Sequence, residues 1–380
     1  MKIAVDVSQL VYQGTGIATY TSRLIDNLLK IDSRNDFVLF GSSLRQRQIL
    51  SNFISGWQQH HHVIAKLYPF PPLFLETLWN RLHVLPIDRL IGKVDVFHSS
   101  DWLQPPTSAA KVTTVHDLIV YRFPESFSSR GGHDIVANQK NRLRWVKKEC
   151  ALIMADSKAT RQDLIDYLGV EPRRIKVIYL AAADIFKPQN QAAINKVKAK
   201  YRLDGDYLFC LGAQEPRKNF NGAVEAFRLL GKTAASCQLV IAGKFAWGDS
   251  QISNFKYQKS KIKTLGLVPQ EDLPALYSGA SCFVYPSFYE GFGLPVLEAM
   301  SCACPVVTTN RGSLPEITAD SAQMVDPDSP EDIAAGIKRI LKLSPSQRRQ
   351  VVVNCVKQAG RFNWSETARQ VLSVYREVAE

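Results

Sequence analysis

Long hydrophobic runs are missing from this chain of 380 residues. No stretch of about 18 consecutive apolar residues occurs, so we expect no membrane-spanning helix. No apolar segment precedes the first charge, because the chain runs directly into Lys2–Asp6, and we expect no cleaved export signal and a cytoplasmic location. The composition, 46% hydrophobic and 22% charged, excludes a disordered, collagen-like or coiled-coil protein. The length predicts two domains.

Cysteine motifs are missing as well. The seven cysteines form no C-x-x-C pair, and a single residue separates Cys302 from Cys304, which is the wrong spacing for a usual zinc or redox site. Most cysteines lie beside apolar residues, so we expect reduced thiols in the core. The consecutive histidines 60–62 cannot all face one point and have no carboxylate nearby, so we expect no metal there.

Acidic residues are too few to balance the basic ones: 35 against 47, which gives a net charge of +12. This charge favours an anionic partner, either nucleic acid, an anionic membrane surface or a phosphorylated substrate. Nucleic-acid binding predicts a basic stripe interleaved with aromatic platforms. The clearest basic cluster has only one aromatic residue, Trp145. Its basic residues are Arg142, Arg144, Lys147 and Lys148. We therefore expect no nucleic-acid partner and interpret this cluster as a candidate contact with an anionic membrane surface.

Short apolar runs alternate with helical periodicity along the chain. The runs end in polar or glycine-rich residues, as parallel strands do where they feed loops at their carboxyl ends. This pattern predicts an α/β fold with two doubly wound domains, residues 1–182 and 183–362, followed by a helix within residues 363–380. Strands are expected over 2–7, 37–40, 94–98, 112–115, 176–180, 207–211, 238–242, 282–285 and 305–309, and helices over 17–29, 142–154, 159–168, 220–230, 295–302 and 330–343.

Residues 65–90 depart from this alternation. They concentrate aromatic residues, prolines and leucines between Tyr68 and Trp79, interleaved with Lys66, Arg81 and Arg89. One interpretation is a mobile amphipathic flap over a lipid or hydrophobic acceptor. The other is a helix whose apolar face closes the core, which aromatic-rich stripes usually do. The residues leave both interpretations open.

Residues 285–298 read YPSFYEGFGLPVLE. A buried strand is followed by a loop with two glycines, and Pro295 suits the first turn of a helix. The amides of this loop would face outward from a helix N-terminus, which favours an anion such as phosphate. Glu290 and Glu298 flank that terminus, and because a phosphate repels carboxylates we interpret them as acceptors for sugar or ribose hydroxyls. From the residues alone, it is equally open that Glu290 is a surface charge of the loop and Glu298 a helix-start charge favoured by the dipole.

The spacing of Glu290 and Glu298 around Gly-Phe-Gly-Leu-Pro resembles the retaining glycosyltransferases of family 4, in their bacterial polysaccharide-type members. Three further parts agree with that family: the glycine turn at 14–16, the loop LGAQEPRKN at 211–219, and the motifs at 312–316 and 325–327. The resemblance spans nearly the whole chain. It implies the GT-B fold, in which two Rossmann-like domains face an interdomain cleft and the last helix packs back on the N-terminal domain.

The resemblance also implies a donor site in the second domain. Lys218 would neutralise the diphosphate of a nucleotide sugar with Arg217 as helper, because electrostatic stabilisation is usually the largest catalytic term. Many family members have an arginine where this chain has Ala213, so Arg217 is a candidate substitute. Glu290 would hold the sugar hydroxyls and Glu298 the ribose. The other implied donor contacts are backbone groups of Gly291, Phe292, Gly293 and Leu294 at the sugar and phosphate, and of Leu267 and Val268 at the nucleobase.

In the first domain, His116 ends a predicted strand and resembles the family histidine beside the reacting face of the donor sugar. Gly16 would let a backbone amide approach the phosphate, because it has no Cβ. His98 and Asp101, after the preceding strand, are candidates for acceptor contacts. We expect catalysis from His116, Lys218 and Glu290 without a metal or a cofactor, since cationic side chains would replace a divalent ion and no Asp-x-Asp pair is expected at a strand end.

The expected function is therefore that of a retaining hexosyltransferase. The expected donor is UDP-glucose, and the acceptor a saccharide or polyprenyl-linked saccharide in polysaccharide biosynthesis. A GDP-mannose-dependent mannosyltransferase is the alternative. A non-catalytic nucleotide-sugar-binding subunit would have lost Lys218 or Glu290, and both are present. Polyprenyl-linked acceptors would bring the protein to the inner face of the cytoplasmic membrane as a peripheral protein, where the basic cluster would find anionic lipid.

Overall fold

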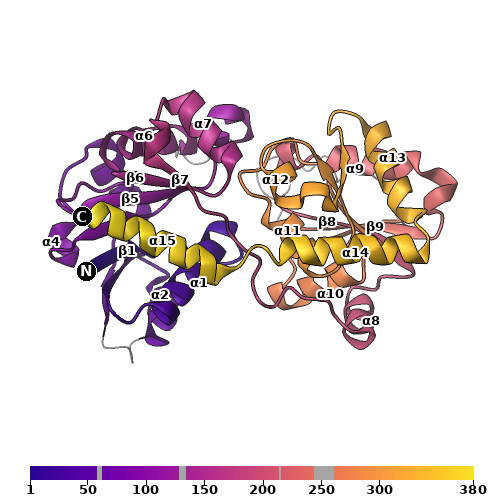
Figure 1. Ribbon diagram of the computed structural model, residues 1–380, viewed down its shortest axis with the longest axis horizontal. Coiled ribbons are helices and arrows are strands. Elements are labelled where there is room, and N and C mark those ends of the chain that lie inside the picture. The colour runs from indigo at the N-terminus through magenta and orange to yellow at the C-terminus, as the bar shows by residue number, and fades with distance from the viewer. Residues whose placement is uncertain (58–61, 128–133, 214, 244–260) are drawn as a thin grey trace. The chain divides into compact units, whose positions relative to one another are not determined.

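The computed structural model describes residues 1–57, 62–127, 134–213, 215–243 and 261–380 (Figure 1). The chain forms two compact units. Unit 1 consists of Met1–Leu180 together with Trp364–Glu380, and unit 2 consists of Ala181–Asn363. Each unit is a parallel sheet with helices, which confirms the α/β prediction. His60 and His61 of the histidine triplet, and Gln214 of the loop at 211–219, lie outside the described residues.

Unit 1 is built on a seven-stranded sheet with the order β3-β2-β1-β4-β5-β6-β7, in which every pair is parallel. The strand order changes direction between β1 and β4, and ligands of such sheets bind outside the carboxyl ends of the strands at this point. The residues that follow β1, β4 and β5 therefore occupy a site position. The strands are β1 Lys2–Asp6, β2 Asp36–Ser42, β3 Val63–Tyr68, β4 Val96–Ser99, β5 Ala110–Val115, β6 Leu152–Ala155 and β7 Ile175–Val177.

Side chains cap the N-termini of two helices of unit 1 that lie close to the strand ends. Thr15 accepts a hydrogen bond from the Ala18 amide at the start of α1, and Ser157 accepts one from the Thr160 amide at the start of α7. The helices are η1 Ser8–Val11, α1 Gly16–Ile31, α2 Arg47–Ser55, α3 Pro72–Leu75, η2 Glu76–Arg81, α4 Asp88–Ile91, α5 Ile119–Arg122, η3 Pro124–Ser126, α6 Ile135–Glu149, α7 Lys158–Leu168, η4 Pro172–Arg174 and α15 Trp364–Ala379.

The C-terminal helix α15 is part of unit 1, although unit 2 separates it from the rest of that unit in the sequence. It packs on α1, β4 and β5, and Figure 1 draws it in yellow next to the rest of unit 1. Its buried side chains recur at helical spacing, from Trp364 to Tyr375. The Thr367 hydroxyl donates to the Tyr179 carbonyl and ties the helix to the end of the first segment.

The helix predicted over residues 142–154 is wrong at its C-terminal end. Helix α6 ends at Glu149, Cys150 adopts an extended conformation, and Leu152–Ala155 forms strand β6 between β5 and β7. A central parallel strand is buried on both faces and shows no alternation of apolar and polar residues, so the run LIMA continues the apolar pattern of the preceding helix. The error concealed the end of a strand next to Asp156.

Residues 65–90 help to close the core of unit 1, which was one of the two interpretations that the sequence left open. Strand β3 takes the first four of these residues, and α3 and the π-helix η2 follow. Leu75 and Trp79 are buried in the core of unit 1, together with Ile87, so this segment does close the core. Tyr68, Phe70, Leu78 and Leu90 are partly buried against the same core. The exposed large apolar residues of this segment are Leu73, Phe74, Leu82 and Val84.

Unit 2 is built on a six-stranded parallel sheet with the order β10-β9-β8-β11-β12-β13. One face packs on α9 and α13, and Tyr277 of α10 packs on Phe209 and Phe283 on the other. The strands are β8 Asp206–Leu211, β9 Cys237–Ala242, β10 Ile262–Gly266, β11 Cys282–Tyr285, β12 Val306–Thr309 and β13 Gln323–Val325. The helices are α8 Gln191–Lys200, η5 Pro216–Lys218, α9 Phe220–Leu229, η6 Gly231–Ala234, η9 Gln270–Asp272, α10 Leu273–Ser278, α11 Leu294–Ser301, α12 Leu314–Thr318, η10 Ala319–Ser321, α13 Pro330–Leu341 and α14 Pro345–Ala359.

All seven cysteines are buried free thiols, as the sequence predicts. Burial raises the pKa of each thiol, which keeps it protonated and unreactive at neutral pH. Among the described helices, none has both the length and the apolar character that a membrane span needs.

Candidate functional site

The loops that follow β8 and β11 bring Lys218 and Glu290 into direct contact in unit 2. The Lys218 ammonium donates to Glu290 Oε1 at 2.7 Å and Oε2 at 2.9 Å, and to the Tyr285 hydroxyl at 2.6 Å. Arg217 Nη1 lies 3.0 Å from Glu290 Oε2, while its Nε donates to Glu215 at 2.7 Å. The two cations and two carboxylates form one neutral cluster, which we call the clamp.

Burial sets the charge state of the clamp. Burial alone would raise the pKa of Glu290, but Lys218 and Arg217 outweigh it and lower that pKa to about 2. Burial, with Arg217 nearby, lowers the pKa of Lys218. Ser287 adds a hydrogen bond of 2.6 Å to Glu290 Oε1. Because Glu290 is only 6% exposed, it acts as the internal counter-ion of both cations.

Sequence reasoning missed Tyr285 and Glu215 as partners of the two cations. Tyr285 is the last residue of β11, which is the position that should have suggested a role at the edge of the sheet. Glu215 lies two residues before Arg217, where a short local ion pair is easily formed but leaves no distinctive pattern.

Hydrogen bonds from Ser313 hold the loop between β11 and α11 in place. The Ser313 hydroxyl donates to the carbonyls of Glu290 and Phe292, which fixes the run from Gly291 to Leu294 at the start of α11. Gly293 is the N-cap of α11 with φ +97°, and a Cβ there would come within 2.8 Å of Leu314. A helix start of this kind favours an anion.

Glu298 lies in α11, in an environment opposite to that of Glu290. Burial raises its pKa to about 8, although the Tyr277 hydroxyl opposes this by donating to Oε2 at 3.1 Å. Glu298 is therefore largely a neutral carboxyl group at pH 7. Of the two residues implied at the nucleobase, Leu267 is 73% exposed and Val268 is buried.

The expectation that no Asp-x-Asp pair stands at a strand end is wrong. Asp326 and Asp328 directly follow β13, and Arg311 pairs with them at 3.5 and 3.1 Å. This arginine offsets one of the two negative charges. Among the described residues, no group of three or more histidine, cysteine or acidic side chains is arranged to hold a metal ion.

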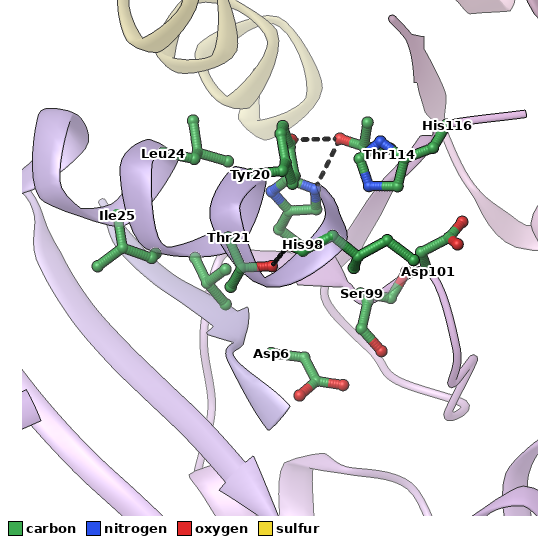
Figure 2. Close-up of a pocket in the computed structure, with 13 residues that line it drawn as sticks. Asp6, Tyr20, Thr21, Leu24, Ile25, His98, Ser99, Asp101, Thr114 and His116 are labelled. Carbon is green, nitrogen blue, oxygen red and sulfur yellow. Dashed lines mark hydrogen bonds between the residues drawn. The ribbon is translucent and has the colours of Figure 1, made fainter. Parts of the chain in front are cut away.

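Unit 1 has a cavity of about 20 Å³ outside the ends of β1, β4 and β5, enough for about one water molecule (Figure 2). His98 and Thr114 line it, and Tyr20 covers it from α1. The Thr114 hydroxyl lies 2.6 Å from the Tyr20 hydroxyl and 3.2 Å from His98 Nε2, while His98 Nδ1 lies 2.7 Å from the Tyr375 hydroxyl of α15. Burial, with His116 nearby, lowers the pKa of His98 to about 3, so His98 is neutral.

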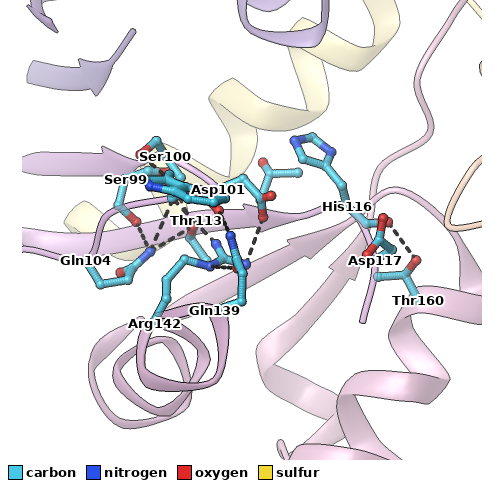
Figure 3. A network of polar contacts seen from close by, with 12 residues as sticks. Ser99, Ser100, Asp101, Gln104, Thr113, His116, Asp117, Gln139, Arg142 and Thr160 are labelled. Carbon is cyan, nitrogen blue, oxygen red and sulfur yellow. Dashed lines mark hydrogen bonds and ion pairs between the residues drawn. The ribbon is translucent and has the colours of Figure 1, made fainter. Parts of the chain in front are cut away.

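Asp101 also lines the cavity, and it forms an ion pair with the buried Arg142 (Figure 3). Arg142 is 1% exposed and lies 2.8 Å from Asp101 Oδ1, and Gln139 connects the Arg142 guanidinium to the Asp101 carbonyl. A buried ion pair contributes little net stability, because desolvation offsets the attraction, and its main effect here is to fix the loop after β4.

His116 also lines this cavity, and a buried carboxylate holds it. His116 Nδ1 lies 2.5 Å from Asp156 Oδ2, and Tyr20 packs edge-on against the imidazole with 4.6 Å between ring centroids. The Thr160 hydroxyl donates to the His116 carbonyl. Gly16, also in unit 1, is the first residue of α1 and has open space where a Cβ would stand, so packing within the protein does not require glycine there.

The basic cluster at 142–148 is smaller than the sequence suggested, because Arg142 is buried in its ion pair with Asp101. The cations of Arg144 and Lys148 each lie 4.9 Å from the centre of the Trp145 ring system. The His83 ring stacks on Trp145 at 3.5 Å, between the exposed side chains of Leu82 and Val84. We call Leu82, Val84, Arg144, Trp145 and Lys148 the basic-apolar surface.

Comparison with known proteins identifies the family. Residues 14–181 match the model described as Glycosyltransferase Family 4, and residues 193–354 match Glycosyl transferases group 1. An O-antigen chain mannosyltransferase B of Escherichia coli is 31% identical over 99% of this chain and 100% of its own. The chain belongs to glycosyltransferase family 4. The sequence resemblance is thereby confirmed, including its bacterial polysaccharide type.

Solved structures support the GT-B fold of this family 4 member. The Anabaena Alr3699/HepE complex with UDP and glucose has a TM-score of 0.69 over 99% of this chain and all of that one, at 18% identity. Sucrose-phosphate synthase from Thermosynechococcus elongatus has a TM-score of 0.72 at 19% identity, over 100% of this chain and 99% of its own. A serotype-specific mannosyltransferase WbdA of Escherichia coli is 29% identical, but this chain aligns with only 34% of its length. The chain is therefore a glycosyltransferase with the GT-B fold.

Proposed function

We propose that this glycosyltransferase moves mannose from GDP-mannose to a hydroxyl group of a saccharide or polyprenyl-linked saccharide acceptor, with retention of the anomeric configuration. The observation that carries the proposal is the clamp, in which Lys218 and Arg217 meet Glu290 beside the N-terminus of α11. The full-length relative is named a mannosyltransferase, which favours GDP-mannose. UDP-glucose, the first expectation from the sequence, lacks such support, since the structure with UDP and glucose is only 18% identical.

In the proposed reaction the bond between C1 of the sugar and the diphosphate oxygen breaks, and negative charge develops on that oxygen. Lys218 and Arg217 would stabilise this charge. The acceptor hydroxyl forms the new bond to C1 on the same face, and its proton passes to the departing phosphate oxygen. These reaction steps need no separate base, no metal ion and no cofactor beyond the donor.

The donor is tested by thermal unfolding in the presence of GDP, UDP and their hexose conjugates. A nucleotide present at one hundred times its Kd raises the free energy of unfolding by about 2.7 kcal/mol. We expect GDP and GDP-mannose to raise the melting temperature more than UDP and UDP-glucose. Equal or larger shifts with the uridine nucleotides would contradict the mannose donor without contradicting a transferase.

Metal independence gives a separate prediction. If the cations of Lys218 and Arg217 replace a divalent ion, transfer of mannose should keep its full rate in excess chelator. The measurement is the initial rate with EDTA against the same assay with added Mg²⁺ or Mn²⁺. Loss of activity in chelator, restored by either ion, would rule out the metal-free mechanism.

We further propose that the basic-apolar surface meets an anionic membrane, where a polyprenyl-linked acceptor would be found. Its exposed Leu82 and Val84 would insert at the interface while Arg144 and Lys148 contact anionic headgroups. Each such cation near the surface adds about 1 kcal/mol of attraction, which salt screens within a Debye length.

The vesicle prediction follows from that charge. The protein should sediment with phosphatidylglycerol vesicles, sediment less with phosphatidylcholine vesicles, and be released as salt rises. The double substitution R144E/K148E should abolish most of this binding, whereas K232E/K342E, which removes two exposed lysines from unit 2, should not. Equal binding to both kinds of vesicle, or equal effects of the two double substitutions, would refute the surface.

A further inference from the structure

We propose that Asp156 is a positioning residue that fixes the ring of His116 and keeps it an imidazolium, whose Nε2–H donates to an oxygen of a ligand bound at the carboxyl ends of β1, β4 and β5. The inference extends the proposed function, and only its last clause depends on that function. It starts from the contact of 2.5 Å between His116 Nδ1 and Asp156 Oδ2. Asp156 follows β6, and His116 follows the neighbouring strand β5, so the pair lies across two adjacent strand ends.

The ion pair with His116 is the main favourable interaction of the buried Asp156 side chain. It is 1% exposed, and within the described part of the chain its other oxygen, Oδ1, has no hydrogen-bond partner. A carboxylate that is removed from water and left half satisfied costs free energy, which an ordinary structural role would avoid. The cost is understandable if the carboxylate is needed to orient and charge the histidine.

The geometry leaves one nitrogen of His116 for a ligand. Because Asp156 occupies Nδ1 and Thr160 holds the backbone carbonyl, the ring cannot rotate without losing the ion pair, and Nε2 is the remaining polar atom. His116 lines the cavity, and its side chain is 13% exposed. A ligand that reaches this edge of the sheet would therefore meet an N–H group with a positive charge.

Several ionisable groups surround His116, and the carboxylates among them favour its charged form. They come from four elements: Tyr20 on α1, His98 on β4, Asp101 in the following loop and Asp156 after β6, with Asp117 next in the chain. Burial opposes the charge on the imidazole, but Asp156, assisted by Asp101 and Asp117, raises the pKa of His116 to about 9. With Nδ1 bonded and Nε2 protonated, His116 is a hydrogen-bond donor at neutral pH and has no free lone pair with which to act as a base.

The first arm of the test needs no substrate. In protein labelled with ¹⁵N at the histidine rings, the resonance of His116, assigned by its loss in H116Q, should show an imidazolium up to about pH 9. Asp156→Asn removes the negative charge but keeps the shape, so the titration should move down to the ordinary value of 6.5 or below. A wild-type His116 that is neutral at pH 7 would overturn the proposal, whether or not the variant folds.

The second arm measures turnover against pH. For D156N we expect a loss of about 30-fold at pH 8, the ratio of protonated fractions for pKa values of 9 and 6.5, and recovery towards the wild-type rate at pH 6. H116Q should lose activity at both pH values. Asp117→Asn is the matched control, since it removes a neighbouring carboxylate without touching Nδ1 and should shift the profile far less.

The outcomes separate the two proposals. A D156N profile parallel to that of the wild type, with an unchanged titration of His116, would overturn the role of Asp156. A D117N shift as large as that of D156N would also overturn it, because the effect would then be a general field. If no donor supports turnover while the titration behaves as expected, the donor assignment fails, and with it the donation from Nε2, but the fixing and charging of His116 stand.

Discussion

Substitution of Lys218 by alanine should lower transfer of the sugar by about a hundredfold or more at saturating donor. Lys218 donates to both oxygens of Glu290 and to Tyr285, and it is the cation most deeply buried in the clamp. Without it the leaving diphosphate would meet Arg217 alone, which is already shared between Glu215 and Glu290. The measurement is kcat with the donor that the nucleotide screen selects, together with the melting temperature of the variant.

The control for this prediction is Lys218→Arg, which retains the charge but changes the shape of the donor group. It should recover part of the lost rate. Lys232→Ala, at an exposed position in the same unit, should change nothing. Unchanged turnover of K218A at saturating donor would show that the clamp does not act on the leaving group.

Glu290→Gln should also lower turnover by about a hundredfold, but for a different reason and with a different binding signature. In the ligand-free protein Glu290 neutralises Lys218 and Arg217. An amide at this position frees both cations, so the variant should bind the bare nucleoside diphosphate at least as tightly as the wild type. What it loses is the carboxylate proposed to hold the hydroxyls of the transferred sugar.

Glu298→Gln provides the matched comparison on the other carboxylate. If Glu298 accepts from the ribose hydroxyls, the variant should bind the nucleoside diphosphate about tenfold more weakly. Wild-type affinity should increase as pH rises through about 8, because ionisation of Glu298 creates the better acceptor, and this increase should be absent in the variant. Calorimetry across pH measures both effects. Equal affinity losses in E290Q and E298Q would mean that the two roles have been misassigned.

The sequence predicted the two α/β domains because their strands and helices have strong local signals. Thr15 and Ser157 cap helices α1 and α7, and glycine or proline lies next to the apolar runs of β8 and β11. The run at Leu152–Ala155 could not be separated from the helix before it, since a strand buried on both faces has no alternation.

That one boundary explains why Asp156 was overlooked. His116 was selected because it ends a strand, and Asp156 satisfies the same criterion once β6 is recognised. The burial of Arg142 could not be predicted either, because it depends on Asp101, 41 residues away in the numbering, and on the sheet that brings them together. The contact between Glu290 and the two cations also joins residues far apart in the sequence. The residue types predicted that these three belong to one site, but not that they contact each other.

Unit 1 cannot be complete until helix α15 has been synthesised, because α15 follows unit 2 in the sequence. The polypeptide leaves this unit at Leu180 and returns to it at Trp364, after the whole of unit 2 has been made. During synthesis, the faces of α1, β4 and β5 that α15 covers must remain open to water, and His98 lacks the hydroxyl of Tyr375 until α15 has been made. Unit 2 is one continuous segment, whereas unit 1 needs two segments of the chain, so the contact of His98 with Tyr375 beside the His116 cavity can form only after unit 2 has been made.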